Sequence, residues 1–203
     1  LQVHHSFPGS NSDAARCHTR GVPPAERGDA LWTCGGWMAG AASSGPAPIG
    51  AFAALDALVA ELHRLWPSVQ TVTLAGFSAG AQMLQHSVGF AAEPPAGVRL
   101  RYVIADPGSW LYFGAVRPQP QRDGRAVDWE ACGRGADFPG PCSFAWTRPD
   151  AAACPTYDGW KYGTANVPAA LRRNAADARA RYAAADIHYL EGALDSSGDK
   201  GTY

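Results

Sequence analysis

Apolar residues recur at helical spacing between positions 49 and 66. An α-helix places residues three and four apart on one face, so this spacing predicts a single apolar stripe. Pro67 follows the last of these residues, and a proline at that point ends a helix. The pattern therefore predicts a helix over residues 49–66. The apolar stripe consists of Ile49, Phe52, Leu55, Leu58, Val59, Leu62, Leu65 and Trp66.

Shorter apolar runs, bounded by Gly and Pro, have the length and composition of β-strands. They alternate with stretches that predict helices. Strands that alternate with helices form βαβ units, so the sequence predicts an α/β fold with a mostly parallel sheet. The expected strands are residues 1–5, 69–75, 98–105 and 187–190, and the further expected helices are residues 82–90 and 169–184.

Residues 107–168 are too long for a plain connection and are rich in Gly, Pro, Trp and Cys. We expect a single domain over residues 1–203 in which this segment is a cap-like insertion over the functional site. Its aromatic side chains either line an apolar cleft or pack a small core of their own. Arg117 and Lys161 are expected to be solvated. The aromatic residues concerned are Trp110, Tyr112, Trp129, Trp146, Trp160 and Tyr162.

Composition excludes some classes of protein. The chain has 17 basic and 18 acidic residues, and this balance argues against a general nucleic-acid surface. No apolar run approaches the roughly 18 residues of a membrane span. The five cysteines form no CxxC pair and no zinc pattern, so we expect no metal site.

Scattered cysteines in a Gly- and Pro-rich chain favour disulfides, and hence a secreted or periplasmic protein. Within the insertion, the sequence leaves Cys132–Cys142 and Cys142–Cys154 open as pairs. Buried free thiols are the alternative. An odd number of cysteines leaves one thiol free or paired outside the chain.

The stretch Gly76-Phe77-Ser78-Ala79-Gly80 lies between an expected strand and an expected helix. Small residues let the chain turn sharply there, so that the Ser78 hydroxyl projects from the apex. The positive end of the helix dipole beneath it favours developing negative charge. A tight structural turn is the alternative, but the strand–Gly–Ser–Gly–helix context favours a nucleophile.

These residues resemble the nucleophile elbow of the α/β-hydrolase superfamily. The stretches "YVIADPGSWLYF" and "WKYG" further resemble a group of secreted bacterial and fungal hydrolases. The resemblance implies a three-layer α/β-hydrolase sandwich in which Ser78 is the nucleophile. It implies oxyanion donors at the backbone N–H groups of Ala79 and Ser10. Phe77, which stands where histidine is common, and Trp110 would contact the substrate.

The resemblance also implies an acid, which we assign to Asp195 in the loop after the last expected strand. A turn-forming role is the alternative for Asp195, and Asp106 is a rival acid. The superfamily has the chain order Ser, acid, His, yet no histidine follows Asp195. We therefore expect the catalytic histidine to come from a second polypeptide or a clipped segment. The six histidines present, none of them a favoured base, are His4, His5, His18, His63, His86 and His188.

The expected function is hydrolysis of a carboxylic ester, small or polymeric, through an acyl-enzyme on Ser78, without a metal or organic cofactor. Two other classes stay open. A peptidase or amidase would use the same triad, and a catalytically inactive relative would only bind its ligand.

Overall fold

The computed structural model describes residues 28–30, 32–33 and 35–192. The expected strand at residues 1–5 lies outside the described residues. So do two of the predicted site residues, Ser10 and Asp195, and three of the histidines: His4, His5 and His18.

A three-stranded parallel sheet forms the centre of the molecule. It consists of β1 (Thr71–Phe77), β2 (Arg99–Ala105) and β6 (Asp186–Leu190), in the order β1-β2-β6. The strands end in register, with Phe77 opposite Ala105 and Ala105 opposite Leu190. Their carboxyl ends thus form one edge of the sheet, where ligands of α/β proteins bind. The predicted α/β class with parallel strands is confirmed.

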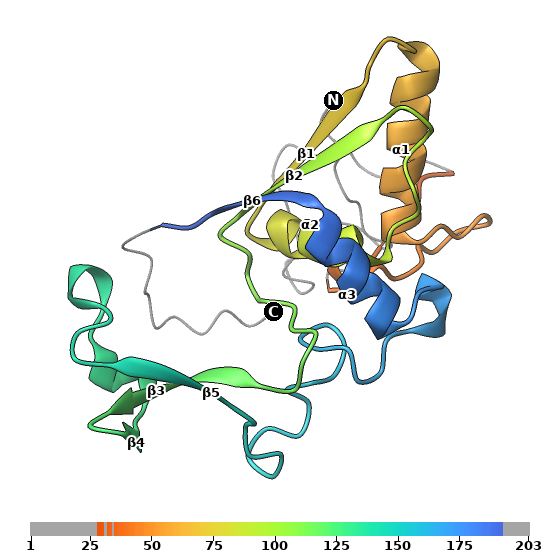
Figure 1. Cartoon of the computed structure of the whole chain (residues 1–203). Helices are drawn as coiled ribbons and strands as arrows, with labels where there is room; N and C mark the ends of the chain where they lie inside the picture. Colours follow the sequence, from red (N-terminus) through yellow and green to blue (C-terminus); the bar gives the residue numbers. More distant parts are fainter. Residues whose placement is uncertain (1–27, 31, 34, 193–203) are drawn as a thin grey trace.

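Three helices cover one face of this sheet: α1 (Ala51–Leu65), α2 (Ala79–Phe90) and α3 (Ala175–Ala184). Figure 1 shows them gathered on the same side of the strands. They bury alternate strand residues, because successive side chains of a strand point to opposite faces. Among the described residues, no helix covers the opposite face, so the third layer of the expected sandwich stays a prediction. The strand residues packed beneath the helices are Val72, Leu74, Leu100, Tyr102, Ile104 and Ile187.

The helix expected over residues 169–184 is divided in two. A 3-10 turn, η5 (Ala169–Leu171), precedes α3, and Arg172 between them has a left-handed backbone with φ of 59°. Asn174 then caps α3, and its side chain accepts a hydrogen bond from the Asp177 N–H at 2.9 Å. An Asn at this position satisfies one of the free N–H groups of the first turn, which fixes where the helix begins.

The expected insertion contains a second sheet that the sequence pattern did not predict. Its strands β3 (Arg117–Arg122), β4 (Arg125–Ala126) and β5 (Ser143–Thr147) are antiparallel, in the order β4-β3-β5. The 3-10 turns η3 (Trp129–Cys132) and η4 (Gly135–Asp137) lie between β4 and β5. We call residues 117–147 the arm, which Figure 1 shows projecting from the rest of the molecule.

A disulfide between Cys132 and Cys142 closes the long β4–β5 connection of the arm, which confirms one of the two expected pairs. Cys154 is an exposed free thiol. No helix in the described part of the chain is long and apolar enough to cross a membrane.

Candidate active site

Ser78 has a backbone conformation that serine rarely adopts. It lies between β1 and α2 with φ of 53° and ψ of −117°, so its φ is positive. Such a conformation costs a non-glycine residue about 1–3 kcal/mol and persists where the surrounding structure enforces it. Ser78 occupies the N-cap position of α2, but its side chain makes no capping hydrogen bond. The Ser78 hydroxyl therefore does not serve as the cap of α2.

Gly76 is required by the close approach of the chain on the other side of the turn. A Cβ added to Gly76 would lie 2.5 Å from the Gly80 carbonyl oxygen and 2.8 Å from the Ala81 nitrogen. Real Cβ atoms do not come this close to backbone atoms, so only glycine fits there. A Cβ added to Gly80 meets no described atom within 4 Å. Within the motif, the surrounding backbone thus requires glycine at position 76 but leaves space for a side chain at position 80.

The backbone of Ser78 is held from both sides. Its N–H donates to the Ala105 carbonyl at the end of β2 at 3.0 Å, and its carbonyl accepts from the Gln82 N–H at 3.0 Å. The Gly108 N–H also reaches this carbonyl, at 3.4 Å. The strained turn is thereby fixed to β2, to α2 and to the start of the insertion.

The N-terminus of α2 points its free backbone N–H groups toward the turn. The first turn of any helix leaves such groups without an intrahelical acceptor, and here they include the N–H of Ala79. No described residue accepts a hydrogen bond from this N–H. Its position next to Ser78 suits the predicted oxyanion donor, while the second predicted donor, at Ser10, lies outside the described residues.

Apolar side chains surround the sheet edge at which Ser78 lies. Phe77 is 68% exposed and Trp110 is 41% exposed, so both predicted substrate contacts are open to solvent. Trp110 packs against Tyr189 of β6, with ring centroids 5.2 Å apart. Leu190 is also exposed and lies in the same row of the sheet as Phe77. Phe77 and Leu190 lie on the face of the sheet opposite the helices, whereas Trp110 packs against Tyr189 on the helix-covered face.

Asp106, the rival acid, has a structural role at the same edge. Its carboxylate accepts a hydrogen bond from the Gly192 N–H at 2.8 Å, and its own N–H donates to the Leu190 carbonyl at 2.9 Å. These bonds join the ends of β2 and β6. Asp195 follows Gly192 by three residues and lies outside the described residues, so its role as the acid stays a prediction.

None of the three described histidines is placed to act as a base for Ser78. His86 is fully buried, and its ring nitrogens face the carbonyls of Gln82 and Lys161, each at 2.5 Å. Burial lowers the pKa of His86 below its ordinary value of 6.5. His188 pairs with Asp186 at 3.0 Å, and His63 lies on α1. His86 and His188 thus have other hydrogen-bond partners, and the expectation that none of the three is the base stays a prediction.

No protein-family model, curated protein or solved structure matches this chain. The resemblance to the α/β-hydrolases therefore depends on the motif and on the geometry of Ser78.

A buried polar face of α2 connects the elbow to the insertion. Gln82, Gln85 and His86 are each at most 1% exposed, although they are polar. The Gln85 side-chain oxygen accepts a hydrogen bond from the Leu111 N–H at 2.6 Å, which aligns the start of the insertion with the helix. The signal in the sequence is a set of polar residues at helical spacing just after the elbow, where an apolar face would be expected.

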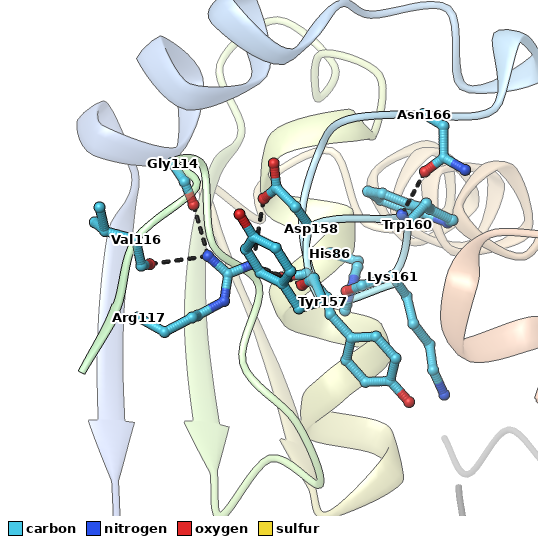
Figure 2. Close-up of polar contacts among 10 residues, drawn as sticks. His86, Gly114, Val116, Arg117, Tyr157, Asp158, Trp160, Lys161 and Asn166 are labelled. Carbon is cyan, nitrogen blue, oxygen red and sulfur yellow. Dashed lines mark hydrogen bonds and ion pairs between the residues drawn. The ribbon is translucent and has the colours of Figure 1, made fainter. Parts of the chain in front are cut away.

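Arg117 was expected to be solvated, and this prediction is wrong. Its side chain is only 15% exposed, and its guanidinium is enclosed by the insertion, as Figure 2 shows. It pairs with the Asp158 carboxylate at 3.3 Å and lies 4.1 Å from the centroid of the Tyr112 ring. It also donates to the backbone carbonyls of Gly114, Val116, Tyr157 and Tyr162 at 2.7, 2.9, 2.8 and 3.3 Å.

Lys161 is likewise half-buried, and burial lowers its pKa. Its backbone carbonyl lies 2.5 Å from the His86 Nε2, while the neighbouring Trp160 donates its indole N–H to the Ala39 carbonyl at 3.0 Å. Trp160 also packs edge-on against His86 and Phe90, with centroids 5.0 and 4.9 Å away. Trp160 is therefore part of the packing that fixes the insertion to α2, and Figure 2 shows it beside His86 and Lys161.

Replacing Arg117 by lysine should loosen the insertion although the charge is kept. A lysine ammonium has three donors and no planar fork, so it cannot reproduce the set of carbonyl contacts. We expect a loss of about 2 kcal/mol in the free energy of unfolding, and faster hydrogen exchange at residues 157–163. Arg148 is exposed, so Arg148→Lys is the matched control. Equal stability of the two variants would contradict the enclosing role of Arg117.

The described residues hold no other site of evident chemistry. They contain no group of three or more His, Cys, Asp or Glu side chains that could bind a metal ion. A surface hollow of about 380 Å³ lies at the start of α3, lined in part by Arg172, Arg173 and Asn174. Its lining includes none of the residues around Ser78.

Proposed function

We propose that the protein is a serine hydrolase that cleaves carboxylic esters through an acyl-enzyme on Ser78. The observation that carries the proposal is the positive φ of 53° at Ser78. Ser78 lies in a strand-to-helix turn in which only glycine fits at position 76. A strained backbone that exposes a hydroxyl at a helix N-terminus is suited to a nucleophile. A simple turn would use Gly, Asn or Asp at this position, because these residues tolerate a positive φ.

In the proposed reaction the Ser78 oxygen attacks the ester carbonyl carbon while a histidine takes the hydroxyl proton. The N–H groups of Ala79 and Ser10 stabilise the oxyanion of the tetrahedral intermediate. The intermediate collapses, and the leaving alcohol receives the proton from the imidazolium. Water then hydrolyses the acyl-enzyme by the same steps, and Asp195 orients the histidine throughout.

The histidine in this proposal comes from outside the described residues. His86 and His188 have other hydrogen-bond partners, and His63 lies on α1. We therefore propose that the base is one of the remaining histidines of the chain or belongs to a second polypeptide segment. The Cys132–Cys142 disulfide supports a secreted or periplasmic location, because disulfides persist in oxidising compartments.

The positions of the three described histidines also favour a second candidate, a catalytically inactive relative that only binds its ligand. Nitrophenyl esters and nitroanilides of the same acyl group distinguish the candidates. We expect saturable ester hydrolysis and no measurable anilide hydrolysis. Saturable anilide cleavage would indicate a peptidase or amidase, and a folded protein that cleaves neither would indicate the inactive relative.

A further inference from the structure

Four large aromatic side chains are exposed on the arm, and they lie together. Trp146 is 64% exposed and Trp129 is 48% exposed, while Phe138 and Phe144 are each 41% exposed. Trp129 stacks on Phe144 with centroids 5.5 Å apart, and Phe138 lies 6.0 Å from Phe144 on centroids. We call these four residues the aromatic face. An exposed apolar patch of this kind on a protein surface marks a binding site.

The register of the arm explains why these rings lie on one side. Phe144 and Trp146 are two residues apart on β5, so their side chains point to the same face of the sheet. They stand opposite Pro120 and Pro118 of β3. Directly opposed residues of an antiparallel pair point to the same face, so the two proline rings lie beside the aromatic rings, and Pro120 is fully buried there.

The disulfide places the other two rings of the aromatic face. Trp129 belongs to η3, which ends at Cys132, and Phe138 lies between Cys132 and Cys142. Phe138 lies inside the loop that the disulfide closes, and Trp129 lies three residues before Cys132 in η3, so the disulfide limits the freedom of the segment that carries both rings. A surface ordered before it meets its ligand loses less conformational entropy on binding.

The charges of the arm favour an uncharged ligand. Residues 117–150 contain five arginines, five acidic residues and no lysine, so their formal net charge is zero. Nucleic acids and anionic lipid surfaces bind where basic residues are in excess. Exposed acidic residues adjoin Trp129 and Phe138 in the sequence: Asp128, Glu130 and Asp137. Their carboxylates are available as hydrogen-bond acceptors.

Two further aromatic side chains lie on the chain between the central sheet and the arm. Tyr112 lies 6.3 Å from Trp146 on ring centroids. Trp110, two residues earlier in the chain, packs on Tyr189 of β6. The chain between the end of β2 and the arm thus carries aromatic rings at both ends. An extended ligand fits this arrangement better than a compact one.

We propose that the aromatic face binds a neutral polysaccharide. One face of a pyranose ring presents C–H groups, which pack on the negative face of an aromatic ring. The hydroxyl groups at the ring's edge hydrogen-bond to polar side chains around the patch. Binding on the arm is independent of catalysis. Ester groups on such a polymer would be the substrate of Ser78, and this part of the proposal rests on the proposed function.

Affinity electrophoresis of the Ser78→Ala protein tests this proposal without any contribution from hydrolysis. The probes are soluble xylan, mixed-linkage β-glucan, glucomannan and galactan, with insoluble cellulose and chitin tested by sedimentation. We expect at least one of them to bind. Adding Trp146→Ala or Trp129→Ala should weaken that binding about tenfold, while Trp146→Phe should keep most of it.

Trp66→Ala is the matched control, because Trp66 is 55% exposed and lies at the end of α1. It should leave binding unchanged. The proposal is overturned if no probe binds, or if Trp66→Ala weakens binding as much as Trp146→Ala. Tighter, salt-sensitive binding to heparin or to vesicles containing phosphatidylserine would also overturn it, in favour of a charged ligand. So would a dimer in light scattering that Trp146→Ala dissociates, since the face would then bind a second copy of the chain.

An esterified polysaccharide that binds to the Ser78→Ala protein and is hydrolysed by the unmodified protein would support both proposals. Polysaccharide binding without any hydrolysis would leave the aromatic face established and the proposed function wrong. Hydrolysis of nitrophenyl esters without polysaccharide binding would support the proposed function and show that the proposal for the aromatic face is wrong. The two proposals therefore fail separately.

Discussion

Ser78→Ala should reduce ester hydrolysis by at least about 10³-fold, because it removes the atom that forms the acyl-enzyme. The substitution leaves the contacts of the fold in place, since the Ser78 side chain makes no capping hydrogen bond. The free energy of unfolding should therefore change little. Initial rates with a nitrophenyl ester, together with a urea unfolding curve, measure both effects.

Ser78→Gly separates the nucleophile from the strained turn. It should abolish hydrolysis equally but unfold at a higher urea concentration than Ser78→Ala. At a φ of 53°, glycine avoids the steric cost that serine and alanine both carry. We expect a gain of about 1 kcal/mol over alanine. Ser87 also lies in α2, so the Ser87→Ala protein allows the effect on hydrolysis to be compared with that of a substitution at a second serine. Full activity in either Ser78 variant would exclude Ser78 as the nucleophile.

Gly76→Ala should destabilise the protein by about 3 kcal/mol or more, because its Cβ would overlap the backbone of the elbow. The atoms it would meet, the Gly80 carbonyl and the Ala81 nitrogen, belong to the first turn of α2 and cannot rotate away. The turn would have to open, and Ser78 would then lose its position. Thermal unfolding and ester hydrolysis should both show the loss.

Gly80→Ala is the control from the same motif, with an expected effect of the opposite sign on stability. The added Cβ meets no described atom within 4 Å, and Gly80 lies in α2. Alanine favours a helix over glycine by about 1 kcal/mol. Equal destabilisation by Gly76→Ala and Gly80→Ala would mean that the close approach at Gly76 does not control the turn.

The parallel sheet and its helices were predictable because their residues follow simple periods. The stripe of apolar residues over 49–66 predicted α1, which runs from Ala51 to Leu65. The glycine–serine–glycine joint predicted the turn between β1 and α2 and a special role for Ser78. Local sequence decides such elements, since their burial follows directly from spacing along the chain.

The arm was not predictable in the same way. Its strand β3 contains Pro118 and Pro120, and proline normally argues against a strand with neighbours on both sides. The Asp123-Gly124 pair was a usable signal, because both residues have positive φ and form the hairpin between β3 and β4. The enclosure of Arg117 depends on segments 40 residues apart, and no local pattern contains that information.

A fluorophosphonate probe tests whether Ser78 is an activated nucleophile, because it forms a stable adduct only with an activated serine. The purified protein is incubated with the probe, and the adduct is located by mass spectrometry of the tryptic peptide 65–99, which contains Ser78. We expect one adduct, on Ser78, that is absent from Ser78→Ala. A folded protein that forms no adduct, or an adduct on a different serine, would contradict this expectation.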